Sequence, residues 1–124
     1  MMKKKVLIVD DSSTVRQQVA EVLTQVGFEV LEAVDGQVGV EVIEREAALA
    51  VVICDVNMPR MNGIELVTSV KSRSKNATLP ILMLTTDGEP ALIRKAKEAG
   101  AKGWMVKPFN PTQLVAAVQK LARP

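Results

Sequence analysis

The chain has 124 residues, of which 48% are hydrophobic and 24% charged, a composition that fits one compact globular domain and excludes a disordered chain. Its formal net charge of +2 is unevenly divided, with six basic and ten acidic residues in 1–62 and ten basic and four acidic residues in 63–124. A basic half would suit nucleic acid, but the chain has three aromatic residues in all and no helix rich in Arg and Asn, so we expect no nucleic-acid partner.

Five short segments rich in apolar residues predict strands, in chain order at residues 6–9, 29–34, 51–54, 81–84 and 103–106. The first, third and fourth runs are uninterrupted, whereas the second and fifth give weaker signals. Continuous apolarity is typical of strands that are buried on both faces, as in a parallel sheet covered by helices.

Helical periodicity follows each predicted strand, with apolar residues recurring at helical spacing. Five strand–helix units without a repeat or a linker predict a single domain, residues 1–124, in which helices cover both faces of the sheet in a doubly wound α/β fold. The first expected helix begins at Ser12 or Ser13 and ends at Gly27, the second begins near Gly36, and the third follows Asn62-Gly63. The fourth has Asp87 as its cap and ends at Gly100, and the fifth begins at Asn110-Pro111.

Polar residues whose side chains can bind a ligand or take part in a reaction follow four of the predicted strands. Asp10 and Asp11 follow the first strand, Asp55 the third, Thr85 the fourth and Lys107 the fifth. Each by itself is explained by a strand that ends in water. Together they predict a shared site, because ligands of open parallel sheets bind beyond the carboxyl ends of the strands.

The three carboxylates indicate a metal site. If the first and third strands are neighbours, Asp10, Asp11 and Asp55 lie in one small cleft, where like charges repel unless a cation lies between them. Oxygen ligands without His or Cys suit a hard ion, and Mg²⁺ fits best. A carboxylate in that cleft could also attack phosphorus, with Lys107 and the Thr85 hydroxyl contacting the phosphoryl oxygens.

Four motifs resemble the CheY-like response-regulator receiver family, in its order and at its spacing. The resemblance covers essentially the whole chain and is strongest to stand-alone chemotaxis receivers. It implies a flavodoxin-like (βα)5 sandwich whose parallel sheet has the order 2-1-3-4-5, and a signalling switch rather than an enzyme. The motifs are Val9-Asp10-Asp11-Ser12, Asp55-Val56-Asn57-Met58-Pro59 with Gly63, Leu84-Thr85-Thr86 and Val106-Lys107-Pro108-Phe109.

The resemblance also implies roles for the residues of the first two motifs. Asp55 would accept a phosphoryl group from a histidine kinase of the CheA-like kind. The side chains of Asp11 and Asp55 and the backbone carbonyl of Asn57 would bind Mg²⁺, and Asp10 would act mainly through water.

The remaining motifs would supply phosphoryl contacts and the switch. Thr85 would bind the phosphoryl group, Lys107 would pair with it, and the Lys107–Pro108 bond would be cis. Thr85 and Trp104 would form the switch pair, although most receivers have Tyr or Phe where this chain has Trp104. Output would pass through the fourth helix, fifth strand and fifth helix of a monomer to a downstream protein target or a phosphatase.

Cys54 and the chain's start bear on the compartment. A single cysteine rules out an internal disulfide and favours a reducing compartment, and we expect Cys54 to be an inert core residue. The apolar run 6–9 is too short for a signal peptide, and no run approaches membrane-spanning length. We therefore expect a cytoplasmic protein without membrane insertion.

Basic residues of the second half have two interpretations. Lys71, Arg73 and Lys75 are expected on a solvated face and turn. A further group is equally compatible with a partner surface and with a merely solvated face; it consists of Arg94, Lys95, Lys97, Lys102 and Lys120.

Three alternative functions remain beside the switch. A phosphatase of the haloacid-dehalogenase type also uses Asp and Mg²⁺, but such enzymes carry a second Asp two residues after the nucleophile, where this chain has Asn57 after Asp55 and Ser12 after Asp10. A degenerate receiver would lack active-site side chains that are all present here. A receiver excised from a longer regulator is also compatible with the sequence.

Overall fold

Strands and helices alternate along the whole of the computed structural model, which describes residues 3–123. The ends of the predicted domain, residues 1 and 124, lie outside this range. Within it, no helix combines the length and the apolarity that crossing a membrane requires. The elements are β1 (Lys5–Val9), α1 (Ser13–Gln25), β2 (Glu29–Ala33), α2 (Gly36–Arg45), β3 (Leu49–Cys54), α3 (Gly63–Lys71), η1 (Ser74–Asn76), β4 (Ile81–Thr85), α4 (Pro90–Ala99), β5 (Gly103–Val106) and α5 (Pro111–Leu121).

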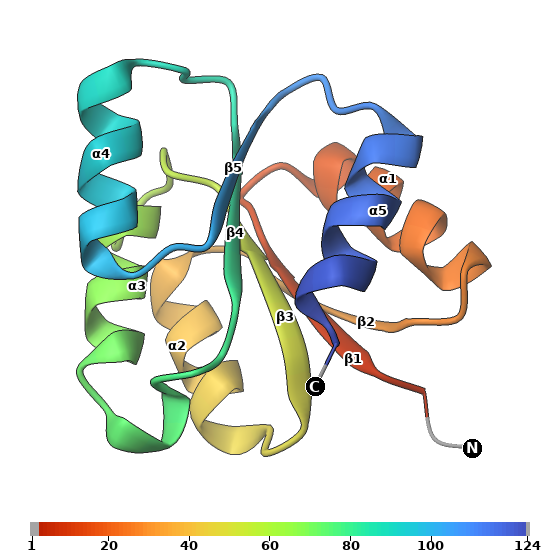
Figure 1. Ribbon diagram of the computed structural model, residues 1–124, viewed down its shortest axis with the longest axis horizontal. Coiled ribbons are helices and arrows are strands. Elements are labelled where there is room, and N and C mark those ends of the chain that lie inside the picture. The colour runs from red at the N-terminus through yellow and green to blue at the C-terminus, as the bar shows by residue number, and fades with distance from the viewer. Residues whose placement is uncertain (1–2, 124) are drawn as a thin grey trace.

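The five strands form one parallel sheet in the order β2-β1-β3-β4-β5 (Figure 1). This confirms the predicted fold class and strand order. Since β1 lies between β2 and β3, the direction in which the chain adds strands reverses at β1. The carboxyl ends of β1 and β3 therefore border the switch point at which ligands of such sheets bind.

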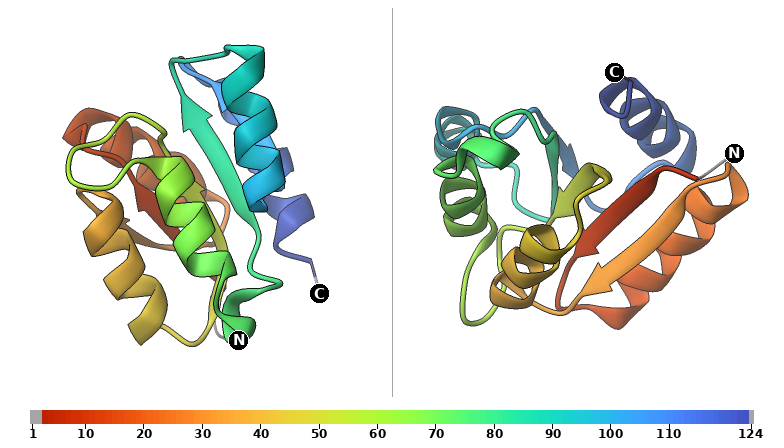
Figure 2. Two further views of the ribbon diagram at one scale, coloured as in Figure 1. Left: turned by 90° about the vertical axis from the view of Figure 1, so that its left-hand side faces the viewer. Right: turned by 90° about the horizontal axis from the view of Figure 1, so that it is seen from below.

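Side chains alternate along the buried strands and so divide the core into two layers. Leu7 and Val9 of β1 face one layer, whereas Val6 and Ile8 face the other. The first layer packs against α2, α3 and α4, and the second against α1 and α5, as Figure 2 shows from two further directions. Because both faces are covered, the central strands β1, β3 and β4 require the continuous apolar runs from which they were predicted.

Four of the five helices begin with a side-chain cap in which an oxygen accepts a hydrogen bond from a backbone N–H. The fourth helix differs from the prediction. Its cap is Glu89, which makes no side-chain cap bond, and Pro90 occupies the first turn. Asp87 instead accepts from the N–H of Glu89 at 3.0 Å, in the turn before the helix. The capping side chains are Ser12, Asp35, Asn62 and Asn110.

Arg73 and Lys75 are exposed as predicted, but Lys71 is half-buried and its ammonium is bound by the chain, so the prediction of a solvated position is wrong for Lys71. Its ammonium donates to the carbonyl oxygens of Asn76 at 3.3 Å, Ala77 at 3.2 Å and Leu79. Burial lowers the pKa of Lys71, and the charge of Lys102 lowers it further. Lys71 therefore joins the end of α3 to the segment that leads into β4.

Replacing Lys71 by Met is expected to lower the free energy of unfolding by about 1–3 kcal/mol, because three carbonyl oxygens lose a charged donor. Met keeps most of the apolar stem, so the loss reports mainly on the ammonium. Lys97→Met, on the exposed face of α4, should change stability by less than about 0.5 kcal/mol. Urea unfolding of both variants measures the difference, and equal values would show that the Lys71 contacts contribute nothing.

Candidate functional site

Adjacent strands, β1 and β3, bring the first and second motifs together. The N–H of Asp55 donates to the carbonyl of Val9 at 3.0 Å, so the pairing of β1 with β3 continues to the point where both strands end. On its other side, β1 ends with the N–H of Asp10 bonded to the carbonyl of Ala33 at 3.1 Å. The backbone thereby fixes where Asp10 and Asp55 emerge from the sheet.

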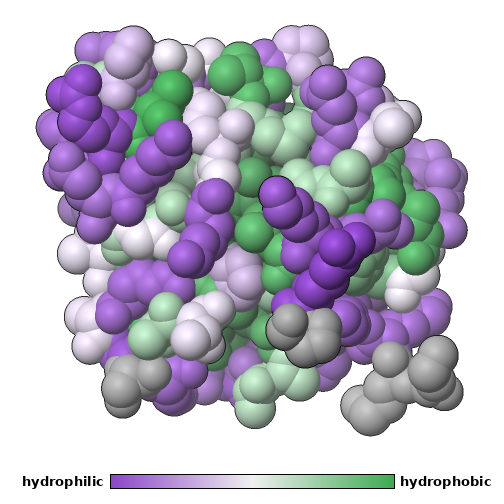
Figure 3. Space-filling model, in the orientation of Figure 1, coloured by the Kyte–Doolittle hydropathy of each residue, from purple (hydrophilic) through white to green (hydrophobic). Residues whose placement is uncertain are grey.

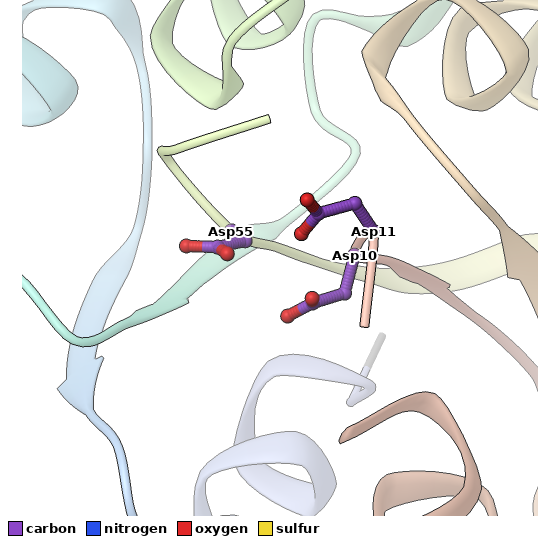
Figure 4. A group of neighbouring side chains, drawn as sticks. All are labelled: Asp10, Asp11 and Asp55. Carbon is purple, nitrogen blue, oxygen red and sulfur yellow. The ribbon is translucent and has the colours of Figure 1, made fainter. Parts of the chain in front are cut away.

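Three carboxylates meet at this edge (Figure 4). Asp10, Asp11 and Asp55 each offer an oxygen that lies within 4.8 Å of the other two. Asp10 and Asp55 are buried, with 0% and 6% of their surfaces exposed, whereas Asp11 is exposed. Two buried carboxylates at this separation need positive charge nearby.

Lys107 supplies that positive charge in the structure. Its ammonium donates to Oδ2 of Asp10 at 2.7 Å and to Oδ2 of Asp55 at 3.1 Å. Burial would lower the pKa of Lys107, but the hydrogen bonds and charges of both carboxylates outweigh burial and raise it. Burial raises the pKa of Asp10 although Lys107 and the N–H of Ser12 act in the opposite direction.

The carboxylate of Asp55 is held in one orientation by its own loop. Its Oδ1 accepts from the N–H of Val56 at 2.7 Å and, more weakly, from the N–H of Asn57 at 3.4 Å. The other oxygen, Oδ2, has no backbone donor among the described residues and contacts Lys107. The two oxygens of Asp55 are therefore distinct: Oδ1 is anchored to the backbone and Oδ2 faces the cationic side of the cleft.

The turn after Asp55 requires glycine at position 63. The N–H of Gly63 donates to the carbonyl of Val56 at 2.9 Å, and a side chain at this position would clash with the backbone carbonyl of Asp55. The first turn of α3 is thus packed against the residue that the sequence singles out as phosphoacceptor. Asn57 lies in the loop between them and is exposed.

Thr85 and Trp104 lie on neighbouring strands, but they are not directly paired. Thr85 is fully buried at the end of β4, and its strand partner is Val106, whereas Trp104 pairs with Met83. The indole of Trp104 packs on the core layer beneath α2, α3 and α4, and its Nε1 is buried without a hydrogen-bond partner among the described residues. A buried indole N–H usually has a partner, so this side chain is not satisfied in this conformation.

Two further predictions about the site's surroundings are confirmed. The Lys107–Pro108 peptide bond is cis. Cys54 is fully buried, and burial raises the pKa of its thiol well above the ordinary value, as expected for an inert core residue.

Arg16 is a part of the site that the sequence did not reveal. From α1, its Nη1 donates to the backbone carbonyl of Asp10 at 2.6 Å, and its Nε donates to Glu32 at 3.0 Å. The side chain is largely buried, with 13% of its surface exposed. It holds the Asp10 peptide in place, but a single Arg in an amphipathic helix carries no signal that would distinguish it from a solvated residue.

The donor set fits a hard divalent cation. The cluster consists of carboxylate oxygens, without His or Cys, and its excess of negative over positive charge favours a cation. The exposed carboxylate of Asp11 leaves one side open to solvent, which suits Mg²⁺ because this ion retains several waters when bound.

Comparison with known proteins gives a consistent result. A family model for the response regulator receiver domain matches residues 6–119. The chemotaxis protein CheY1 of Helicobacter pylori is 44% identical over 111 residues, which cover 89% of this chain and 90% of that protein. The chemotaxis protein CheY of Thermotoga maritima is 37% identical over 123 residues, covering 98% and 100%. A crystal structure of the Vibrio cholerae chemotaxis protein CheY4 matches with a TM-score of 0.91 and 42% identity, covering 97% of this chain and 99% of the other.

Proposed function

The chain belongs to the response regulator receiver domain family, and from this premise we propose that it is a phosphorylation switch whose phosphoacceptor is Asp55. The observation that carries the proposal is the convergence of Asp55 with Asp10, Asp11 and Lys107 at the carboxyl edge of the sheet. We propose that the whole chain acts as one receiver domain of the stand-alone chemotaxis type.

Asp55 would act as the nucleophile through Oδ2, the oxygen that has no backbone donor. A bond forms between this oxygen and the phosphorus of a phosphohistidine or of acetyl phosphate, and the bond from phosphorus to the donor breaks, with its electron pair leaving on the donor. Lys107 would transfer its hydrogen bonds from the carboxylates to the phosphoryl oxygens, and the Thr85 hydroxyl would donate a further one. Hydrolysis of the acyl phosphate would restore the carboxylate.

Mg²⁺ would be held by the side chains of Asp11 and Asp55 and by the backbone carbonyl of Asn57, with Asp10 acting through water. When bound, the ion would neutralise the charge that develops on the phosphoryl oxygens. The chain's own residues orient the reacting oxygen: Val56 fixes Oδ1 of Asp55, and Ser12 fixes Oδ1 of Asp10 at 2.9 Å.

The proposed phosphodonor is a histidine kinase of the CheA-like kind, and the proposed receiver of the signal is a downstream protein or a phosphatase. We propose α4, β5 and α5 as the output face of a cytoplasmic monomer. Hydrophilic residues gather over α4 on the left of the face in Figure 3. The exposed basic residues of this face favour an acidic partner surface; they are Arg94, Lys95, Lys97, Lys102 and Lys120.

The experiment that tests the function is phosphorylation with a small donor. Wild-type protein incubated with acetyl phosphate and Mg²⁺ should gain the mass of one phosphoryl group, and the same incubation with a chelator should leave the mass unchanged. Intact-mass spectrometry measures both. A chain that never gains the group, or gains it equally without the metal, would contradict the proposal.

Phosphorylation should change the fluorescence of Trp104. If Thr85 moves towards the phosphoryl group, the packing at the end of β4 changes beside the strand that carries Trp104, and a packed core favours a discrete rearrangement. The unsatisfied indole N–H would allow such a rearrangement without the loss of a hydrogen bond. Tryptophan emission should therefore shift when beryllofluoride is added at constant Mg²⁺. The shift can be assigned to Trp104, because it is the only tryptophan in the sequence.

The control for this measurement is Thr85→Val, which keeps the shape of the side chain and removes the hydroxyl. Beryllofluoride should then occupy Asp55 with a smaller change in emission. Unchanged emission of the wild type while amide resonances show Asp55 to be occupied would place the output on a different face.

A further inference from the structure

The loop between β3 and α3 contains a backbone turn that is unfavourable for its residue. Arg60 has a φ of 69°, and the N–H of Met61 donates to the carbonyl of Pro59 at 2.7 Å. A hydrogen bond from an N–H to the carbonyl two residues earlier, around a central residue with positive φ, defines a γ-turn of the rare and strained kind. Residues with side chains larger than that of Asn seldom adopt this conformation, so Arg60 needs external support.

That support comes from the first turn of α2. Nη1 of Arg60 lies 3.3 Å from Oδ2 of Asp35, and Nε and Nη2 donate to Oε1 of Gln37 at 2.9 and 2.5 Å. We call these three side chains the Arg60 clasp. Asp35 is a rigid anchor, because it is 4% exposed and its Oδ1 also caps α2 by accepting from Val38 at 2.9 Å.

The backbones on the two sides of the clasp also touch. A side chain at Gly36 would clash with the backbone carbonyl of Met61, so the loop lies directly against the start of α2. The loop is therefore fixed at three points: at Val56 and Gly63 by a hydrogen bond, and at Met61 by this close approach. Arg60 adds a further point of attachment, which it makes to α2 through its side chain.

The turn at Arg60 bears on the phosphorylation site through the backbone. Asn57, whose carbonyl we propose as a metal ligand, lies three residues before Arg60 in the same loop, and its N–H approaches Oδ1 of Asp55 at 3.4 Å. No hydrogen bond or ion pair joins Arg60 to Asp10, Asp11 or Asp55 within the described residues. Apart from the long-range repulsion between its charge and a cation, Arg60 can therefore affect the metal only through the shape of the loop.

We propose that Arg60 is a positioning residue for Mg²⁺ binding: the Arg60 clasp holds the strained turn, and the turn sets where the Asn57 carbonyl is presented. The inference rests on the proposed function, since it assumes a metal at the acidic cluster. It extends that function by making the first turn of α2 part of the apparatus that determines metal affinity.

Two substitutions of Arg60 separate the clasp from the backbone strain. Arg60→Ala removes the clasp and leaves a side chain at positive φ, so the turn should relax and Mg²⁺ affinity should fall about fivefold to tenfold, less than the about 10–100-fold effect of residues that contact a ligand directly, because Arg60 acts at one remove. Arg60→Gly removes the clasp and the strain together, because Gly adopts positive φ freely, and should bind Mg²⁺ within about twofold of the wild type. Calorimetric titration with MgCl₂ measures both.

The matched control is Arg73→Ala. Arg73 is exposed to a similar degree, 49% against 54% for Arg60, and pairs with a carboxylate of another element, Glu44. Its removal costs one surface ion pair but should leave Mg²⁺ affinity unchanged. If Arg60 only stabilised the fold, Arg60→Ala and Arg73→Ala would both be less stable than the wild type, and the two variants would bind Mg²⁺ with the same affinity.

The outcomes distinguish this inference from the proposed function. Wild-type protein that does not bind Mg²⁺ would contradict the proposed function, whereas equal affinity of the wild type and Arg60→Ala would overturn only the role of Arg60. Equal weakening in Arg60→Ala and Arg60→Gly would overturn the strain argument. NMR spectra of the metal-free proteins give an independent readout. Arg60→Ala should shift the amide resonances of residues 56–58, and Arg73→Ala should not.

Discussion

Asp55→Asn is expected to abolish phosphorylation by acetyl phosphate altogether. Asn has nearly the shape of Asp and can still accept hydrogen bonds from Val56 and Asn57, but its amide does not attack phosphorus. The fold should persist, because the substitution removes one of three crowded carboxylates and Lys107 keeps Asp10 as a partner. Intact mass after incubation with the donor and Mg²⁺ should match that of the untreated variant.

The control for this experiment is Glu98→Gln, an exposed acid on α4. It removes the same charge far from the cluster and should be phosphorylated like the wild type. If Asp55→Asn gained a phosphoryl group at the wild-type rate, another carboxylate would be the acceptor. The assignment that the geometry favours would then be wrong.

Asp11→Ala is expected to remove most Mg²⁺ binding, weakening it by at least about 100-fold, because loss of a direct ligand should exceed the 10–100-fold typical of outer-shell residues. Asp11 is the exposed carboxylate of the cluster and has no charged partner in the described part of the chain. When a chelator keeps the protein free of metal, Asp11→Ala should raise the free energy of unfolding by up to about 1 kcal/mol, because one of three mutually repelling charges is lost.

Opposite signs of the two effects make this prediction specific. A variant that was simply misfolded would lose both metal binding and stability. Calorimetric titration with MgCl₂ and thermal unfolding with and without the metal measure them separately. A titration curve of Asp11→Ala that superimposes on that of the wild type would show that the metal, if bound, lies elsewhere.

Much of the fold could be predicted because its determinants are local. The uninterrupted apolar runs correspond to strands buried on two faces, and most helix starts were found from capping residues such as Asn62 and Asn110. The strand order came from the family resemblance, since a pattern of apolar residues does not specify which strands pair. The start of α4 was missed because Pro90, rather than the capping residue Asp87, fixes where that helix begins.

The site was predictable to the extent that backbone topology determines it. Parallel strands end at a common edge, so the residues after β1 and β3 had to meet once those strands were neighbours. The contacts of Arg16, Arg60 and Lys71 could not be predicted, because each depends on where a long side chain points once a turn or a neighbouring element is in place. Each of these residues looks like a solvated charge in the sequence, and each holds a backbone turn in the structure.

The most direct test of the central claim is to identify the modified residue chemically. An acyl phosphate on a carboxylate is reduced by borohydride to an alcohol, which would convert phosphorylated Asp55 into homoserine. After treatment with acetyl phosphate, Mg²⁺ and borohydride, peptide mass spectrometry should find homoserine at position 55 and unmodified acids at positions 10 and 11. Homoserine at either of those positions, or at none, with phosphorylation demonstrated in the same sample, would contradict Asp55 as the phosphoacceptor.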